Sequence, residues 1–350
     1  MIQELDLQIV GMGGTGAFGN DVSQLAGLLR NGEVKPQWIE MQKSDESARV
    51  PVFKAAVRGV LKQYISPRQA RRLDSFSALA IYAACSCLAD AGVKDDGDKS
   101  RIGLVLGTGF GPVETTFAFF EDLFVDGDWA ASPTKFSHSI QNAAATQISL
   151  LCGIADVSYT LNVFELSFLS GLPLVNDLLQ RGIADYVLWG AVDEVSPAVA
   201  YCYHRLFGDI PATMTPLDFR RQTAIPGEGG AFFLIGRSGE DHPGCRGKIR
   251  GLACGEVQRG IPGEICSKPR VILGADGHRC TGQWYAKIME NIELHGVDVL
   301  APAVTYGAFP SGSALALATG LGMNAYGWRD FALWQANPDG AWLWLQVENA

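Results

Sequence analysis

The 350-residue chain lacks several features that would assign it to a class directly. Its eight cysteines are scattered, with no C-x-x-C pair and no cysteine–histidine spacing typical of zinc sites. No apolar run reaches membrane-spanning length, and residues 1–6 have neither the basic region nor the cleavage site of a signal peptide. We therefore expect a soluble protein of the reducing cytoplasm, without a metal site, in which Cys85 and Cys87 are buried free thiols.

An excess of basic residues is also missing. The formal net charge is −9, which argues against nucleic acid and against an anionic membrane surface as partners. The same charge disfavours this chain as the main docking surface for a strongly acidic carrier protein.

What the chain does contain is ordinary for a globular protein: 47% apolar residues, 19% charged residues and 41 glycines. Strand-like runs alternate with helical runs, which predicts an α/β layered domain. We expect strands near residues 5–10, 102–106, 157–163, 185–189, 230–235, 248–253, 271–273, 297–300, 331–335 and 342–347. We expect helices near residues 21–30, 67–91, 113–125, 140–151, 169–181, 281–294 and 312–321.

A polar, Gly- and Pro-containing segment at 238–247 predicts a seam between two halves, residues 1–240 and 241–350.

Residues 11–16 read Gly-Met-Gly-Gly-Thr-Gly and match the G-x-G-x-x-G fingerprint of dinucleotide-binding domains. That fingerprint also needs an acidic residue after a second strand, about 20 residues on. Here the chain runs instead through a loop at 31–36. The segment is therefore interpreted as a tight strand-to-helix turn, and a nucleotide-dependent oxidoreductase is a minor alternative.

The segment around Glu165 predicts a strand that turns sharply into a helix starting near Leu169. Several folds place a reactive side chain at such an elbow, because the helix N-terminus stabilises negative charge there. Glutamate is already an anion and a poor nucleophile toward a thioester. Three roles for Glu165 stay open: a buried neutral acid, an anion held by the helix dipole, or a hydrogen-bonding partner across a dimer.

Several motifs, in the expected order, resemble the β-ketoacyl synthase family of the thiolase fold. The resemblance is specific as far as residue 235 and fainter after it. They are IVGMG at 9–13, GLVLGTGFG at 103–111, QNAAATQIS at 141–149, RGIAD at 181–185, GAVDE at 190–194 and PGEGG at 226–230. The resemblance implies a thiolase-like layered αβαβα fold of two related halves, and no cofactor.

The resemblance also implies that the family's catalytic groups are absent. Glu165 stands at the position of the nucleophilic cysteine, Asp276 and Ala308 stand at those of the two histidines, and Ala303 is near that of the lysine. His278 and Cys280 are offset from these motifs, so surface or packing roles are expected for them. Condensation needs a thiolate and neutral imidazoles, so neither ketosynthase activity nor decarboxylation is expected.

A ketosynthase-like chain without these groups resembles the chain-length factor, the non-catalytic partner of an active ketosynthase. The resemblance implies a heterodimer in polyketide or polyene biosynthesis, with aryl polyene systems as the expected type, that meets an acyl carrier protein only indirectly. The implied interface strand comprises Val157, Ser158, Tyr159, Thr160, Leu161, Asn162, Val163 and Phe164. The implied channel positions are Val113, Thr116 and Phe120, whose spacing places them on one helical face.

Two other interpretations remain beside this one. The first is a diverged acyltransferase or decarboxylase that acts on acyl thioesters through Cys280, His278 or Glu165. The second is a homodimer with a packed interface, in which the stripe of Val113, Thr116 and Phe120 is simply core.

Overall fold

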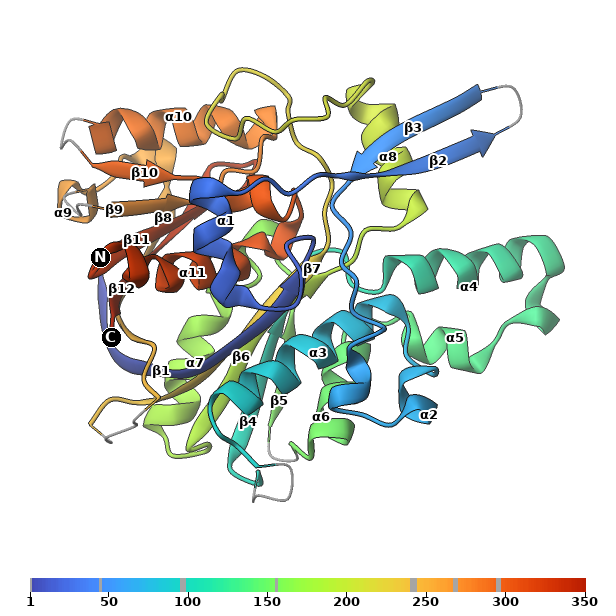
Figure 1. The fold of residues 1–350 in the computed structure, drawn as a ribbon, viewed down its shortest axis with the longest axis horizontal. Coiled ribbons are helices and arrows are strands. Elements are labelled where there is room, and N and C mark those ends of the chain that lie inside the picture. The colour runs from blue at the N-terminus through green and yellow to red at the C-terminus, as the bar shows by residue number, and fades with distance from the viewer. Residues whose placement is uncertain are drawn as a thin grey trace.

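The computed structural model describes residues 2–43, 46–94, 99–154, 157–239, 244–266, 270–293 and 297–350 (Figure 1). Ten strands form one hydrogen-bonded sheet in the order β10-β9-β11-β12-β8-β1-β7-β6-β4-β5. Their bounds are β1 Gln3–Gly16, β4 Ile102–Gly107, β5 Ser158–Leu161, β6 Tyr186–Asp193, β7 Gly229–Arg237, β8 Gly247–Glu256, β9 Arg270–Leu273, β10 Asp298–Leu300, β11 Asp330–Ala336 and β12 Ala341–Asn349. A separate hairpin pairs β2, Gln37–Lys43, with β3, Glu46–Val52.

The two halves of this sheet repeat one topology. The first half has the strand order β1-β7-β6-β4-β5 and the second has β8-β12-β11-β9-β10. When the strands of each half are ranked along the chain, both halves have the order first, fifth, fourth, second, third. The pairing directions also match, with two antiparallel pairs followed by two parallel pairs in each half. This is the expected fold of two related halves. Residues 240–243, at the predicted boundary, lie outside the described residues.

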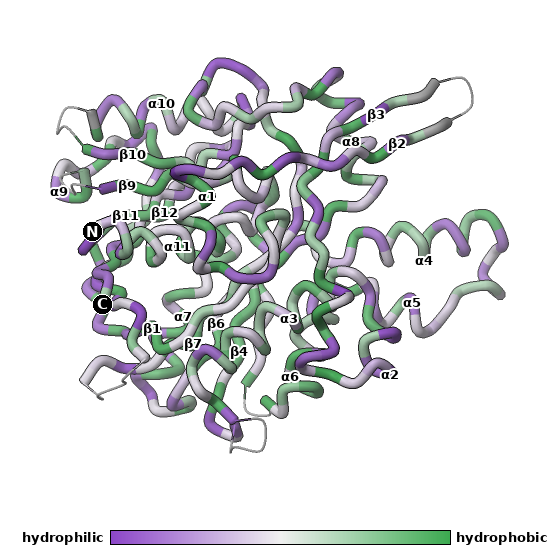
Figure 2. The backbone as a smooth tube through the Cα atoms, in the orientation of Figure 1, coloured by the Kyte–Doolittle hydropathy of each residue, from purple (hydrophilic) through white to green (hydrophobic). Residues whose placement is uncertain are grey.

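Helices cover both halves of the sheet and lie between them. They are α1 Leu25–Asn31, α2 Pro67–Ala70, α3 Ser75–Asp90, α4 Val113–Asp126, α5 Pro133–His138, α6 Ala143–Cys152, α7 Leu172–Gln180, α8 Pro197–Phe207, α9 Gly263–Cys266, α10 Arg279–Glu293 and α11 Ser313–Gly322. Three apolar cores result: α3 and α6 pack on the first half, α9 and α10 pack on the second, and α7 and α11 lie between the halves. The strands β4, β6 and β7 are almost wholly buried and largely hydrophobic (Figure 2).

The glycines at residues 11–16 lie inside strand β1, so the predicted strand-to-helix turn is wrong. They let α3 pack directly on the strand. A Cβ atom on Gly13 would lie 2.2 Å from the backbone nitrogen of Cys87, and one on Gly11 would lie 2.8 Å from the Cys87 carbonyl oxygen. The repeated glycines therefore serve close helix–strand packing in place of phosphate binding.

Other differences concern element boundaries. The helix expected at 67–91 is two helices, because Asp74 caps a new start by accepting a hydrogen bond from the Ser77 N–H at 2.7 Å. The strand expected at 157–163 covers only Ser158–Leu161. The hairpin β2–β3 and helix α8 were not predicted, although α8 begins with a Ser196 cap followed by proline, as α2 does.

Helices α4 and α5 form an arm that projects from the body of the molecule on the same side as the β2–β3 hairpin (Figure 1). Neither helix has a fully buried residue. Among the helices of the described ranges, none combines the length and apolarity needed to cross a bilayer.

Candidate functional site

The chain turns sharply after β5, at the predicted elbow. Phe164 has a φ of 47°, and no other non-glycine residue of the described chain has a positive φ. This left-handed conformation is strained for an aromatic residue. The Ser167 hydroxyl holds the turn, since its Oγ accepts from the Val163 N–H at 2.8 Å and lies 2.7 Å from the Phe164 carbonyl oxygen. Glu165 follows directly, in a single turn of 3-10 helix, Phe164–Leu166.

The helix after the elbow starts later than predicted. A second 3-10 turn, Leu169–Gly171, comes first, and α7 begins at Leu172. Glu165 is therefore outside the first turn of α7, and the α-helix dipole falls off beyond that turn.

Asp193, at the end of β6, joins two loops around this elbow. Its carboxylate accepts hydrogen bonds from the Thr108 hydroxyl at 2.8 Å, the Phe110 N–H at 2.7 Å and the Ser311 N–H at 3.0 Å. Burial raises the pKa of Asp193, and these hydrogen bonds oppose that rise. The carboxylate thus fixes the loops that carry Phe110 and Pro310 against the elbow.

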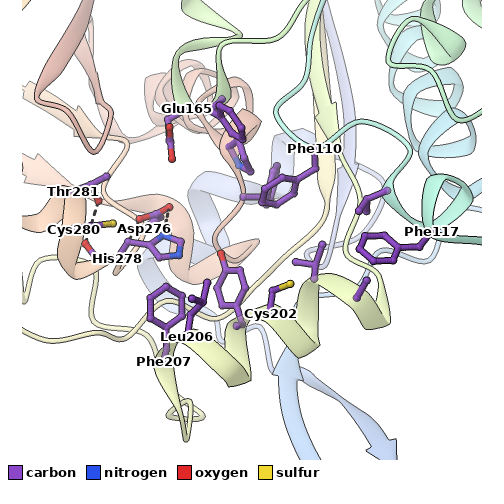
Figure 3. A pocket seen from close by; sticks show the side chains of 17 residues that line it. Phe110, Phe117, Glu165, Cys202, Leu206, Phe207, Asp276, His278, Cys280 and Thr281 are labelled. Carbon is purple, nitrogen blue, oxygen red and sulfur yellow. Dashed lines mark hydrogen bonds and ion pairs between the residues drawn. The ribbon is translucent and has the colours of Figure 1, made fainter. Parts of the chain in front are cut away.

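These loops and α8 enclose a pocket of about 370 Å³, within the usual range for small-molecule sites (Figure 3). Its lining comprises Phe110, Val113, Phe117, Phe164, Glu165, Ala198, Val199, Cys202, Tyr203, Leu206, Phe207, Asp276, His278, Cys280, Thr281, Phe309 and Pro310. In Figure 3 the polar groups of Glu165, Asp276, His278 and Cys280 gather on one side, and Phe110 and Phe117 lie on the other. The pocket is therefore an apolar cavity with one polar end.

An ion pair forms the centre of that polar end. The Oδ2 atom of Asp276 lies 2.9 Å from Nδ1 of His278, and both side chains are 17% exposed. The imidazole packs against Tyr203 and Phe207, with ring centroids 5.4 Å and 5.7 Å away. Burial disfavours both charges, but their mutual attraction outweighs it, so the pKa of Asp276 is lowered and that of His278 is raised.

The carboxyl of Glu165 behaves in the opposite way to that of Asp276. Burial raises the pKa of Glu165 and Asp276 raises it further, against the lowering effects of its own backbone N–H and of His278. Of the three open roles, the buried acid that readily accepts a proton agrees best with this environment. Burial, followed by Asp276, also raises the pKa of the Cys280 thiol. This environment disfavours the thiolate form of Cys280 that a nucleophilic cysteine needs.

The alanines at the predicted catalytic positions lie apart from the pocket lining. Ala303 and Ala308 are buried in the central core. The backbone of Ala308 bonds to the neighbouring glycine loop, with its N–H 2.7 Å from the Ile225 carbonyl oxygen and its own carbonyl 3.0 Å from the Gly227 nitrogen. The backbone at Ala308 therefore holds the glycine loop in place, and its methyl side chain has no group that could take part in acid–base chemistry.

The predicted channel residues on α4 separate into two groups. Val113 lines the pocket, but Thr116 and Phe120 do not. The Thr116 hydroxyl lies 2.9 Å from the Pro112 carbonyl oxygen, and Phe120 stacks on Phe124 at a centroid distance of 5.9 Å. Phe117, four residues after Val113, completes the pocket wall. That spacing was visible in the sequence, but Phe117 was not predicted.

His278 and Cys280 were expected to have only surface or packing roles. His278 does pack in the interior, and Cys280 is exposed, but both also line the pocket beside Asp276. The signal in the sequence was the Asp-Gly-His spacing, which lets one loop present a carboxylate and an imidazole together. Within the described ranges, no three His, Cys, Asp or Glu side chains are grouped in a way that could hold a metal ion.

Strand β5 forms one edge of the ten-stranded sheet. Of the predicted interface residues, Ser158 to Leu161 form the strand and Val157, Asn162, Val163 and Phe164 flank it. Tyr159, Val163 and Phe164 are exposed, and the arm beside them exposes further apolar side chains. These are Phe117, Phe120, Phe124, Val125, Trp129 and Phe136.

Comparisons with known proteins agree with this architecture. Residues 6–240, more than half of the chain, match the β-ketoacyl synthase N-terminal domain. The oxytetracycline polyketide putative beta-ketoacyl synthase 1 of Streptomyces rimosus is 27% identical over 239 residues, which cover 60% of this chain and 55% of that protein. The chain therefore aligns with little more than half the length of this relative.

Two solved structures share the fold, and each match covers 99% of this chain and 100% of the matched chain. The ishigamide ketosynthase/chain length factor has a TM-score of 0.80 at 15% identity. A type II polyketide ketosynthase, in complex with its acyl-carrier protein and bound to a hexaketide, has a TM-score of 0.73 at 16% identity. Together with the strained elbow and the duplicated five-stranded topology, these matches show that the chain belongs to the β-ketoacyl synthase family and has a thiolase-like fold.

Proposed function

We propose that this chain is a non-catalytic chain-length factor that pairs with an active ketosynthase and shapes its acyl channel. The observation that carries the proposal is Glu165, a partly buried carboxyl of raised pKa at the elbow where the family has its nucleophile. A carboxyl cannot replace a thiolate in accepting and releasing an acyl chain by thioester exchange. The second imidazole position is occupied by the methyl group of Ala308, so the stabilisation of a decarboxylation enolate is also missing.

The exposed strand edge supports the proposed pairing. An unpaired edge strand is a template for another strand, and proteins normally protect such edges. Beside β5 lies an arm with six exposed large apolar residues, an amount of apolar surface that is typical of interaction sites. We infer that β5 pairs with the same strand of an active ketosynthase and that the arm packs across the interface.

The orientation of α4 supports the proposed gating role. Phe120 is 45% exposed and does not line this chain's own pocket. Phe120 and Thr116 are therefore available to line a channel that belongs to the partner, whereas Val113 borders the pocket of this chain. The stacked pair of Phe120 and Phe124 would form the closed end of that channel.

The biological setting follows from the same proposal. The ketosynthase subunit would carry the growing chain and receive it from an acyl carrier protein, so this acidic chain would meet the carrier only indirectly. We propose a polyketide or polyene product, of aryl polyene type, made in the cytoplasm. The halves would divide at residues 1–240 and 241–350.

Co-expression tests the proposal. An active ketosynthase from the same biosynthetic system is produced alone and together with this chain. We expect the ketosynthase alone to be insoluble or inactive, and a soluble, active complex to form when this chain is present. A ketosynthase that is equally soluble, equally active and makes the same products without this chain would contradict the proposal.

A second candidate function is a diverged acyltransferase or decarboxylase. It is favoured by the Asp276–His278 pair, in which a carboxylate orients an imidazole as in many general bases. Turnover of malonyl- or acyl-thioesters by the isolated chain, and its loss in Asp276→Asn and His278→Gln variants, would establish this function. Cys280→Ser and Glu165→Gln test the other two candidates at the polar end, and Cys254→Ser, at an exposed cysteine outside this pocket, serves as the matched control.

A further inference from the structure

Two cysteines that are 67 residues apart in the sequence meet between helices α3 and α6. The Sγ atoms of Cys85 and Cys152 lie 3.4 Å apart. A disulfide bond is about 2.0 Å long, so rotation of these side chains by a small amount would bring the sulfurs into bonding range. We propose that Cys85 and Cys152 form a reversible disulfide, a redox modification site separate from the pocket at Glu165.

The positions of the cysteines on α3 explain why Cys85, and not Cys87, lies beside Cys152. Cys87 lies two residues after Cys85 on α3, and residues two apart point to different faces of a helix. Cys87 is fully buried on the face that packs against the glycines of β1, and burial raises its pKa well above the ordinary value. Cys85 instead turns toward α6. The structure thus contrasts a close pair of thiols, Cys85 and Cys152, with the fully buried thiol of Cys87 two residues along α3.

An oxidant can reach the pair from solvent. Cys85 and Cys152 both line a surface cavity of about 600 Å³, together with Tyr64, Lys94 and Lys99. The Lys94 ammonium group places a positive charge at the cavity wall, which favours an anionic oxidant. Oxidised glutathione, a disulfide that carries several carboxylates, is the chemical class of oxidant that fits this lining.

The reaction proceeds by two exchanges. The thiolate of one cysteine attacks the S–S bond of oxidised glutathione, a mixed disulfide forms and one glutathione thiolate leaves. The thiolate of the second cysteine then attacks the protein sulfur of the mixed disulfide, and the second glutathione thiolate leaves. The protein gives up two electrons and two protons, and one oxidised glutathione becomes two molecules of glutathione.

The disulfide would link the C-terminal end of α6 to α3. Helix α3 packs on β1, β6 and β7, whereas α6 packs on β4 and on the edge strand β5. Cys152 is the last residue of α6, close to where the chain continues toward β5. Closure of a 67-residue loop restricts the unfolded chain, so oxidation should raise the thermal midpoint, by about 5 °C.

The test treats the folded, full-length chain with oxidised glutathione and maps its disulfides by mass spectrometry without reduction. We expect a Cys85–Cys152 cross-linked peptide that dithiothreitol removes, and a higher thermal midpoint that reverses with it. Cys85→Ser and Cys152→Ser should each abolish the cross-link, whereas the matched control Cys254→Ser, at an exposed cysteine, should retain it. Fragment ions that break the chain at Ser86 distinguish Cys85 from Cys87.

The proposal is overturned if Cys254 becomes glutathionylated while Cys85 and Cys152 stay reduced. It is equally overturned if they carry only mixed disulfides, or if Cys152 bonds to Cys87. The wild-type measurement decides the matter even where a serine variant fails to fold. None of these outcomes depends on whether the chain pairs with a ketosynthase.

Discussion

The carboxylate of Asp276 and the imidazole of His278 lie 2.9 Å apart on one loop, at the polar end of the pocket that also contains Glu165. We propose that Asp276 stands where the family has a catalytic histidine, and the imidazole of His278 lies two residues further along the same loop. This pair makes the pocket chemically distinct from a simple apolar core.

The ion pair predicts a change in the titration of His278. In Asp276→Asn the attraction that raises the imidazole pKa is lost while its burial remains, so the pKa of His278 should fall from above 6.5 to below it. The imidazole proton signals in NMR spectra recorded across pH 4–9 measure this, with His278→Gln providing the assignment. Asp177→Asn, at an exposed ion pair on α7, should leave the titration unchanged.

The same pair predicts how stability depends on pH. The pKa of Asp276 is lowered on folding, so its contribution is present above about pH 3.8 and is lost as the pH falls through the lowered value. The pKa of His278 is raised, so its contribution is present below about pH 6.5 and is lost as the pH rises through the raised value. The difference in unfolding free energy between wild type and Asp276→Asn should therefore be largest between these limits. Urea denaturation at pH 3, 5 and 9 tests this, and a difference that does not change with pH would contradict it.

A second buried carboxyl predicts a loss of stability at alkaline pH. Burial raises the pKa of Glu194 from 4.5 to about 8. Its Oε1 accepts from the Glu114 N–H at 2.8 Å, and within the described part of the chain its Oε2 has no hydrogen-bond partner. Between these pH values the unfolded chain has lost a proton that the folded chain keeps, so folding stability declines as pH rises, by up to about 5 kcal/mol. In Glu194→Gln this contribution is absent, and the variant should gain stability relative to wild type from pH 5 to pH 8.5. Glu121→Gln, at an exposed position of α4, should show no such gain.

The free edge of β5 predicts a way to block heterodimer formation. The carbonyl oxygens of Val157 and Leu161 accept from Leu104 and Thr108, so these residues face β4 and the alternate residues Ser158 and Thr160 face the open edge. Thr160→Pro removes an edge donor while the pairing with β4 remains, and should weaken the complex with a ketosynthase at least about tenfold.

The matched control is Thr160→Val. The Thr160 hydroxyl is buried and has no hydrogen-bond partner among the residues that the structure describes, so valine should fold at least as well and should keep the edge donor. Analytical ultracentrifugation of the co-purified proteins measures both variants. Equal affinities for Thr160→Pro and wild type would show that the two chains meet elsewhere.

The exposed side chain of Phe120 on α4 predicts control of product length. In a complex with an active ketosynthase, Phe120→Ala removes the side chain proposed to close the partner's channel, so the products should become longer by one or more two-carbon units. Phe124→Ala, one helical turn further from the body and 81% exposed, should have a smaller effect. Mass spectrometry of the released chains decides, and an unchanged product distribution for Phe120→Ala would count against the gating role.

Local patterns in the sequence determined much of the architecture. The alternating apolar runs predicted the ten strands of the large sheet, and the segment around Glu165 predicted the elbow, because both depend on neighbours along the chain. The polar, short strands of the β2–β3 hairpin gave no comparable signal. The glycines of residues 11–16 were misinterpreted, since their role is set by the approach of α3 from 70 residues away.

The sequence by itself determined that this chain keeps the layered fold and its elbow, and it led to the proposal that Glu165 stands at the nucleophile position there. Only the tertiary structure decided which side chains meet: Asp276 and His278 with Glu165, Cys85 with Cys152, and Phe117 in place of Phe120 at the pocket wall. The physical reason is that strand and helix periodicities are properties of short segments. Burial, pKa values and thiol contacts depend instead on how distant segments pack against one another.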